Sequence, residues 1–191
     1  MRRTPDSHRQ SGVSLIEVMV TLLILSIGLL GVAGLQSRLQ LSEMEAYQRS
    51  QALLLLNDMA NRIAANRSSA ADYVTGTSSS LGVGTSSCTT SSTVRVDIDQ
   101  SEWCTALQGA AESIASGGSS TQVGAMVGAR GCVEDIGDNQ YMVTVAWQGM
   151  GPISAPPASV ACGSGQYNSG SACINDLCRR VVTTIVRVAD L

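Results

Sequence analysis

Residues 12–37 read GVSLIEVMVTLLILSIGLLGVAGLQS, and this stretch decides the fold. From Val18 to Ser37 the chain carries no charge and is rich in Leu, Ile and Val. At about 1.5 Å rise per residue, these residues make about 30 Å of helix, which matches the hydrocarbon core of a bilayer. We therefore expect an apolar helix here, buried in lipid or among other helices.

The polar residues before this stretch set its orientation. Residues 1–12 contain Arg2, Arg3 and Arg9 and no apolar run. Because basic residues stay on the cytoplasmic side, we expect the N-terminus inside the cell and the remainder of the chain across the membrane.

The helix is expected to continue beyond the apolar stretch, because residues 35–75 contain neither Pro nor Gly. Apolar residues recur there every three, four or seven positions, at Leu39, Ala46, Leu53, Leu56, Ala60 and Ile63. We predict one helix ending near Asn66, with residues 13–37 in the membrane or filament core and residues 38–67 as an amphipathic continuation. The second part should pack on the chain's own head.

The remaining residues, 68–191, predict an α+β head with a small antiparallel sheet packed on the long helix. Ser, Thr and Gly make residues 68–92 a surface loop. Residues 101–115 read as a short helix on which Trp103, Leu107, Ala110 and Ile114 share a face. Strands are expected at residues 131–136, 141–147 and 179–188, with a turn at 137–139 and a long Pro/Gly/Ser loop over 149–176. Strand 141–147 should be half-buried.

Six cysteines without a Cys-x-x-Cys pair indicate disulfides formed in an oxidising compartment. They are Cys88, Cys104, Cys132, Cys162, Cys173 and Cys178. The preferred pairings are Cys162 with Cys173 or Cys178, and Cys104 with Cys88 or Cys132. The alternative is unpaired core cysteines.

The composition argues against catalysis and against nucleic acid as a partner. The net charge is −3 and the pI is about 5.0, which disfavours nucleic acid. His8 is the single histidine, lysine is absent, and no Gly-x-Gly-x-x-Gly occurs, so triads, histidine metal ligands and phosphate loops have no candidates. The acidic residues at 134, 135 and 138 fit a turn better than a calcium loop. Arg179 and Arg180 fit a solvated pair on an edge strand better than a partner contact. We expect no cofactor, no metal and no enzymatic activity.

The segment Gly12-Val13-Ser14-Leu15-Ile16-Glu17-Val18, followed directly by the apolar helix, resembles the signature of the type IV pilin-like family. Residues 26–36 look like the PilV-type minor pilins in particular, and segments 143–147 and 179–182 are similar to them too. The resemblance implies that a prepilin peptidase/N-methyltransferase removes the leader, residues 1–12, by cleaving after Gly12, and then methylates Val13. The apolar helix is then kept as the filament core.

The resemblance also implies the partners and the location. The N-terminal helix would contact other major and minor pilins, the inner-membrane assembly machinery and, before assembly, membrane lipid. The chain would begin as a single-pass protein of the bacterial inner membrane with its head in the periplasm, and would end in the extracellular pilus. The expected role is priming of pilus assembly or a place in the tip complex, in support of twitching motility and adhesion.

Glu17 and three glycines are the candidate assembly residues on physical grounds as well. A carboxylate at the edge of hydrocarbon costs about 2–3 kcal/mol without a partner, and cleavage would create an ammonium at Val13, on this subunit or a neighbour. The alternative is an interfacial charge at a helix start. Gly28, Gly31 and Gly34 would allow either close helix packing or bending.

Three other functions remain open. A minor pseudopilin of a type II secretion system would carry nearly the same signature, although the cysteine-rich head favours the pilus. A secreted disulfide-rich binding protein would be cut after Gly34 by a conventional signal peptidase, but Glu17 interrupts the start of its apolar region. A secreted hydrolase is disfavoured because no histidine follows His8.

Overall fold

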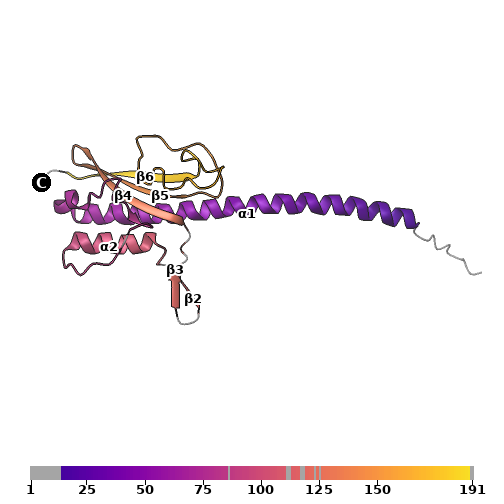
Figure 1. Cartoon of the computed structure of the whole chain (residues 1–191), viewed down its shortest axis with the longest axis horizontal. Helices are drawn as coiled ribbons and strands as arrows, with labels where there is room; N and C mark the ends of the chain where they lie inside the picture. The colour runs from indigo at the N-terminus through magenta and orange to yellow at the C-terminus, as the bar shows by residue number, and fades with distance from the viewer. Residues whose placement is uncertain are drawn as a thin grey trace, which may run out of the picture. The chain divides into compact units, whose positions relative to one another are not determined.

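The computed structural model describes residues 14–85, 87–110, 113–116, 119–122, 124 and 126–189, with the backbone alone for residues 113–116 and 119–122. The chain divides into two compact units, one up to Ser42 and one from Glu43 onward. The elements are α1 (Leu15–Ala65), the 3-10 helix η1 (Arg67–Tyr73), β1 (Leu81–Gly82), α2 (Arg95–Leu107), β2 (Ser113–Ser116), β3 (Ser119–Gln122), β4 (Val127–Gly137), β5 (Gln140–Gln148) and β6 (Arg179–Arg187) (Figure 1).

The long helix forms as predicted. α1 has 51 residues and is long and apolar enough, by length and composition, to span a membrane. In the second unit its buried face consists of Gln48, Ala52, Leu56, Met59 and Ile63. The predicted stripe was partly wrong, because Leu53 is 41% exposed. The run of four leucines at 53–56 is apolar on every side, so its periodicity could not show which side the head covers.

The head, which is the second unit, is built on a four-stranded antiparallel sheet in the order β1-β4-β5-β6. Strands β4 and β5 meet at a two-residue turn, where Asp138 and Asn139 have φ angles of 51° and 54°. Positive φ at both central residues is the pattern of a type I′ hairpin turn, and Asp and Asn tolerate it well. Strands β2 and β3 form a separate two-stranded sheet.

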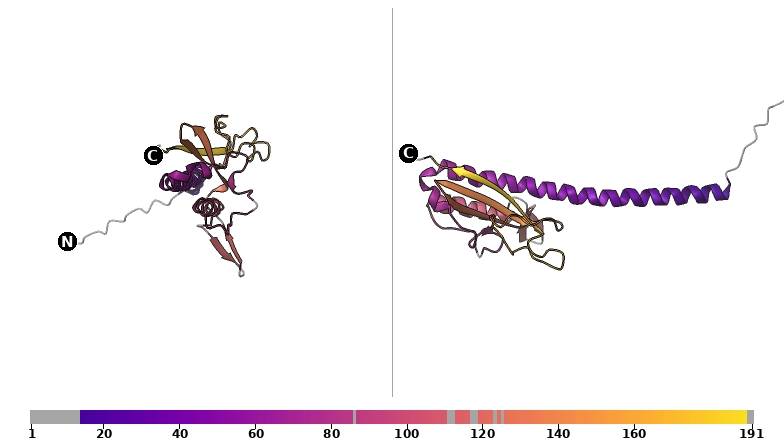
Figure 2. Two further views of the ribbon diagram at one scale, coloured as in Figure 1. Left: turned by 90° about the vertical axis from the view of Figure 1, so that its left-hand side faces the viewer. Right: turned by 90° about the horizontal axis from the view of Figure 1, so that it is seen from above.

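Two helices cover one face of the main sheet, as the end-on view of Figure 2 shows. The indole of Trp103 on α2 donates a 2.9 Å hydrogen bond to the carbonyl of Leu55 on α1. The same ring lies directly against Gly131 of β4, where a Cβ would come within 2.2 Å of it. Gly131 is therefore needed for the close approach of α2 to the sheet.

The other face of the sheet is partly covered by the loop between β5 and β6. Cys162 and Tyr167 of this loop pack on Cys132 and Ala146. The prediction of a half-buried strand 141–147 was therefore wrong for Thr144 and Ala146, which are fully buried. Nothing in the period-two pattern shows that a loop will return over the second face.

Two further sequence predictions need correction. The short helix runs from Arg95 to Leu107 and not over residues 101–115; it ends before Gly109, which adopts φ of +91°, and Ile114 lies in β2. Val96, Asp99, Trp103, Cys104 and Leu107 form its buried side. The predicted loop over residues 68–92 contains η1 and β1, because buried Ala70 and Tyr73 hold the first part of it against the core.

Candidate functional site

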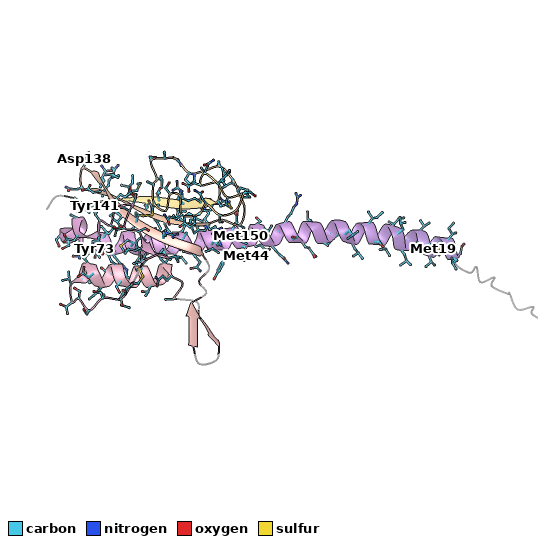
Figure 3. The ribbon with its side chains drawn as sticks, viewed as in Figure 1. Met19, Met44, Tyr73, Asp138, Tyr141 and Met150 are labelled. Carbon is cyan, nitrogen blue, oxygen red and sulfur yellow. A yellow bond between two sulfur atoms is a disulfide. The ribbon has the colours of Figure 1, made fainter. Side chains whose placement is uncertain are left out.

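The part of α1 that lies in the first unit, up to Ser42, presents a continuous apolar surface. Every described side chain of residues 14–42 is exposed, and the large apolar ones lie on all sides of the helix (Figure 3). Leu15 is 72% exposed and Leu30 is 73% exposed. A contiguous apolar surface of this extent is not left in water by soluble proteins, so it requires lipid or other helices around it.

The two hydroxyl side chains between Val18 and Leu35, those of Thr21 and Ser26, form hydrogen bonds within their own helix. The hydroxyl of Thr21 donates to the carbonyl of Val18 at 2.9 Å, and the hydroxyl of Ser26 donates to the carbonyl of Leu22 at 2.6 Å. Because these hydroxyls bond back to the preceding turn, they need no partner from water. The segment is therefore compatible with an apolar environment despite its hydroxyl groups.

Glu17 lies in the first turn of α1, where an acidic side chain complements the helix dipole. The carbonyl of Ser14 accepts the backbone N–H groups of Glu17 at 3.0 Å and of Val18 at 3.3 Å, so the helix begins at this point. The carboxylate is exposed. Gly12 and Val13, the predicted cleavage and methylation residues, lie outside the described residues.

The three glycines of the apolar stretch have no structural role within the described chain. A Cβ built on Gly28, Gly31 or Gly34 meets nothing within 4 Å. All three sit inside α1, where Gly costs about 1 kcal/mol relative to Ala. Close packing at these glycines therefore needs a helix from another molecule, whereas bending of the helix needs none.

Within the head, the two arginines at the start of β6 are paired, Arg179 buried and Arg180 half-buried, so the interpretation of a solvated pair was wrong. Arg179 donates to the carbonyls of Val160 at 2.6 Å and Cys162 at 3.1 Å. Arg180 donates to Glu45 at 3.1 Å and to the carbonyl of Gly151 at 2.7 Å. These arginines organise the loop before β6, which the sequence did not reveal because Glu45 and the carbonyls of Gly151, Val160 and Cys162 lie far from them in sequence.

A second buried charge, also missed from the sequence, joins α1, η1 and α2. Asp99 is 1% exposed; it accepts hydrogen bonds from Tyr73 at 2.6 Å and from Arg62 at 2.8 Å, and it pairs with Arg95. Burial raises the pKa of Asp99, but the hydrogen bonds from Tyr73 and Arg62 outweigh it and hold the pKa below its usual range. Burial and the bond to Asp99 raise the pKa of Tyr73. The signal for this site was the Arg95–Asp99 spacing of four on a helix.

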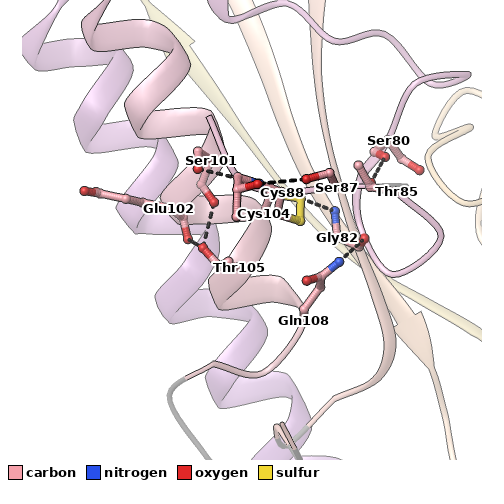
Figure 4. The surroundings of a disulfide bond; sticks show 11 residues. Ser80, Gly82, Thr85, Ser87, Cys88, Ser101, Glu102, Cys104, Thr105 and Gln108 are labelled. Carbon is pink, nitrogen blue, oxygen red and sulfur yellow. Dashed lines mark hydrogen bonds between the residues drawn. A yellow bond between two sulfur atoms is a disulfide. The ribbon is translucent and has the colours of Figure 1, made fainter. Parts of the chain in front are cut away.

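All six cysteines are paired in the head, as Cys88–Cys104, Cys132–Cys162 and Cys173–Cys178. The preferred partners of Cys162 were therefore wrong, because Cys162 bonds Cys132 on β4 and not the nearby cysteines of its own loop. The partner of Cys104 is one of the two that the sequence left open. Figure 4 shows the Cys88–Cys104 disulfide beside Gly82, whose backbone nitrogen lies 3.2 Å from the sulfur of Cys104.

A polar cavity of about 720 Å³ lies beside the segments 77–85 and 161–166, and Arg130 is the one ionisable side chain among its described lining residues. An arginine has no general-base function near neutral pH. Over the same described part of the chain, no group of three or more His, Cys, Asp or Glu residues could hold a metal ion.

Two family models match the chain. Residues 7–33 match the prokaryotic N-terminal methylation motif, and residues 34–115 match the model described as type IV pilin Tt1218. Neither a curated protein nor a solved structure gives a match. The first match contains the apolar helix start with Gly12 and Glu17, and the second covers the rest of α1 together with α2.

Proposed function

We propose that the chain serves as a minor pilin of the PilV type, which primes pilus assembly or joins the tip complex, because its two matches are to type IV pilin Tt1218 and to the prokaryotic N-terminal methylation motif. Through that role it supports twitching motility and adhesion. The observation that carries the proposal is the exposed apolar surface of α1 up to Ser42, which begins within the matched methylation motif. Such a surface is suited to lipid before assembly and to neighbouring helices after it.

The chain is organised accordingly into four segments. Residues 1–12 are a cytoplasmic leader, residues 13–37 are the transmembrane and filament-core helix, residues 38–67 continue the helix, and residues 68–191 form the head. Cleavage after Gly12 and methylation of Val13 precede assembly. The subunit starts in the inner membrane with its head in the periplasm, and the assembly machinery moves it into the extracellular filament.

Glu17 provides register in this scheme. Apolar helices in a bundle can slide along one another, because dispersion contacts between their side chains depend little on the axial register. An ion pair between Glu17 and the Val13 ammonium of a neighbouring subunit fixes the axial position of each helix, because an unpaired carboxylate in hydrocarbon is costly. Gly28, Gly31 and Gly34 then allow neighbouring helices to approach closely.

The test measures how much of the Glu17→Gln variant, relative to wild type, is recovered in sheared filaments and in the inner membrane. The neutral side chain keeps its size and is cheaper to bury, so membrane insertion stays normal. Losing one partner of a poorly solvated pair commonly costs about 3–5 kcal/mol, so we expect at least a tenfold loss from the filament fraction. Glu43→Gln is the matched control, because Glu43 is exposed on the same helix. Normal filament levels of the Glu17 variant would show that this carboxylate has no role in docking.

A further inference from the structure

The two edges of the main sheet are protected to very different degrees. One edge is β1, which has two residues and packs against α2. The other edge is β6, which has nine residues and pairs with β5 from Arg179 to Arg187 without a register shift. The sheet therefore ends on one side in a long, regular strand (Figure 1).

The hydrogen bonds at the two ends of the β5–β6 ladder show which backbone groups of β6 face outward. Gly149 N–H donates to the carbonyl of Cys178 at 2.8 Å, and Val188 N–H donates to the carbonyl of Asn139 at 2.9 Å. In an antiparallel ladder hydrogen-bonded pairs alternate, so the even-numbered residues of β6 bond to β5. The outward N–H and C=O groups are those of Val181, Thr183, Ile185 and Arg187. Among the described residues, none of these groups has a hydrogen-bond partner beyond β6.

From Val181 to Val186 this edge lacks the features that normally keep strands apart. Natural edge strands carry charged side chains, Pro, a bulge or a covering segment. This part of β6 has no charged residue, no Pro and no bulge, and its outward residues from 181 to 185 are β-branched. Ile185 lies opposite Met142 of β5, on the sheet face that the β5–β6 loop covers only in part, and it is 50% exposed. The free edge therefore combines unpaired backbone groups with an exposed apolar side chain.

We propose that the outer edge of β6 receives an extended segment of a neighbouring pilin subunit, which adds a fifth strand to the sheet. This inference rests on the proposed function. The outward groups alternate along the strand at a spacing that only another extended backbone can match. The incoming strand places an apolar or β-branched side chain beside Ile185 and favours an acidic one near Arg187.

The partner segment is not the β6 strand of a second copy. Subunits of a filament are related by rotation about its axis and translation along it, so a given strand keeps the same axial direction in every copy. Two β6 strands would then run parallel, whereas antiparallel pairing is the more stable arrangement. A different segment, running opposite to β6, fits the edge, and the contact is heterologous as filament growth requires.

The experiment places the photocrosslinking residue p-benzoyl-phenylalanine at position 185 of the full chain in piliated cells. The matched control is position 174, because Ile174 is 49% exposed but lies on the loop before β6. We expect light-dependent adducts between position 185 and another pilin subunit in the filament fraction, at least tenfold above those from position 174. Adducts only between two copies of this chain, equal adducts at both positions, or no adducts from filaments that contain the chain would each overturn the proposal.

A backbone variant tests the hydrogen bonds themselves. Thr183→Pro removes an outward N–H without removing a donor to β5, and Thr183→Ala keeps that N–H. We expect the Pro variant to lose most of the adduct at position 185 and the Ala variant to keep it, with unchanged melting of the head in both. Equal adduct yields in the two variants would contradict strand addition. If the chain is missing from filaments altogether, the proposed function fails first and this inference falls with it.

Discussion

Nη2 of Arg180 lies 3.1 Å from Oε1 of Glu45, which ties the first turn of α1 within the head to the first residues of the last strand. The same carboxylate oxygen accepts the backbone N–H of Met150 at 3.2 Å. The Glu45 side chain thus contacts two residues that lie 105 and 135 positions further along the chain, Met150 and Arg180. The side chain of Arg180 is only 12% exposed, so Glu45 is the counter-ion of a guanidinium that is largely shielded from water.

Replacing Glu45 by Gln is expected to destabilise the head by about 1–2 kcal/mol, because it leaves a mostly buried guanidinium without its counter-ion. The measurement is thermal unfolding of the full chain in detergent, followed by near-ultraviolet circular dichroism. Glu43→Gln, which alters an exposed carboxylate on the same helix, should leave the melting temperature unchanged. Equal melting of the two variants would mean that the backbone carbonyls of Gly151 and Leu177 suffice to hold Arg180.

Asp99→Asn is expected to cost about 3–5 kcal/mol, because it removes the acceptor charge that faces Arg62 and Arg95 in a buried site. The folded-state pKa of Asp99 is depressed, so its contribution is present above the unfolded value of about 3.9 and is lost as the pH falls through the folded-state pKa. Stability curves of wild type and variant should therefore converge in acid. Asp97→Asn, at an exposed position of α2, should cost less than about 1 kcal/mol. Curves that stay parallel down to acid pH would exclude a charged Asp99.

Glu134→Gln is expected to stabilise the head by about 1 kcal/mol at neutral pH. Burial raises the pKa of Glu134, and its Oε1 is buried without a hydrogen-bond partner among the described residues. A raised folded-state pKa means that folding favours the protonated form, so the cost of the ionised side chain appears as the pH rises through that pKa. The increase in the free energy of unfolding that Gln gives should become smaller in acid. Chemical denaturation of wild type and variant at two pH values measures this difference. A variant that is less stable than wild type at neutral pH would show that the carboxylate has a partner.

Removing Cys132–Cys162 is expected to cost about 3–4 kcal/mol, and removing Cys173–Cys178 about 2 kcal/mol, since the loops they close span 30 and 5 residues. The first bond also lies in the packed cluster with Ala146 and Tyr167, so its loss loosens the loop on the outer sheet face. Paired Cys→Ala variants, compared by denaturant midpoint, measure both effects. A larger cost for the shorter loop would show that local packing, and not chain entropy, dominates.

The long helix and the β4–β5 hairpin could be predicted because their signals are local. The uncharged run from Val18 to Ser37 needs no partner to be recognised, and the Asp138-Asn139 turn follows directly from two residues that tolerate positive φ. Both features depend on residues that are adjacent in the sequence, so the sequence alone is sufficient to predict them.

The start of α2 and the partner of Cys162 could not be predicted because they depend on distant contacts. Asp99 is a polar residue on the buried face of α2; its spacing of four from Arg95 is a local signal, but its burial depends on Tyr73 and Arg62, which are distant in sequence. Cys162 has two cysteines nearer in sequence than Cys132, which it reaches because its loop folds back over β4. The same loop buries Thr144, which the alternating pattern assigned to solvent.

The central claim, that the chain is a processed filament subunit, is tested most directly by the N-terminal residue of the chain recovered from sheared filaments. Mass spectrometry of that fraction should identify a mature chain that begins with N-methylated Val13, without the leader that contains Arg2, Arg3 and Arg9. A chain that begins at Leu35, that retains Met1, or that is found only in the membrane and never in filaments would contradict the account.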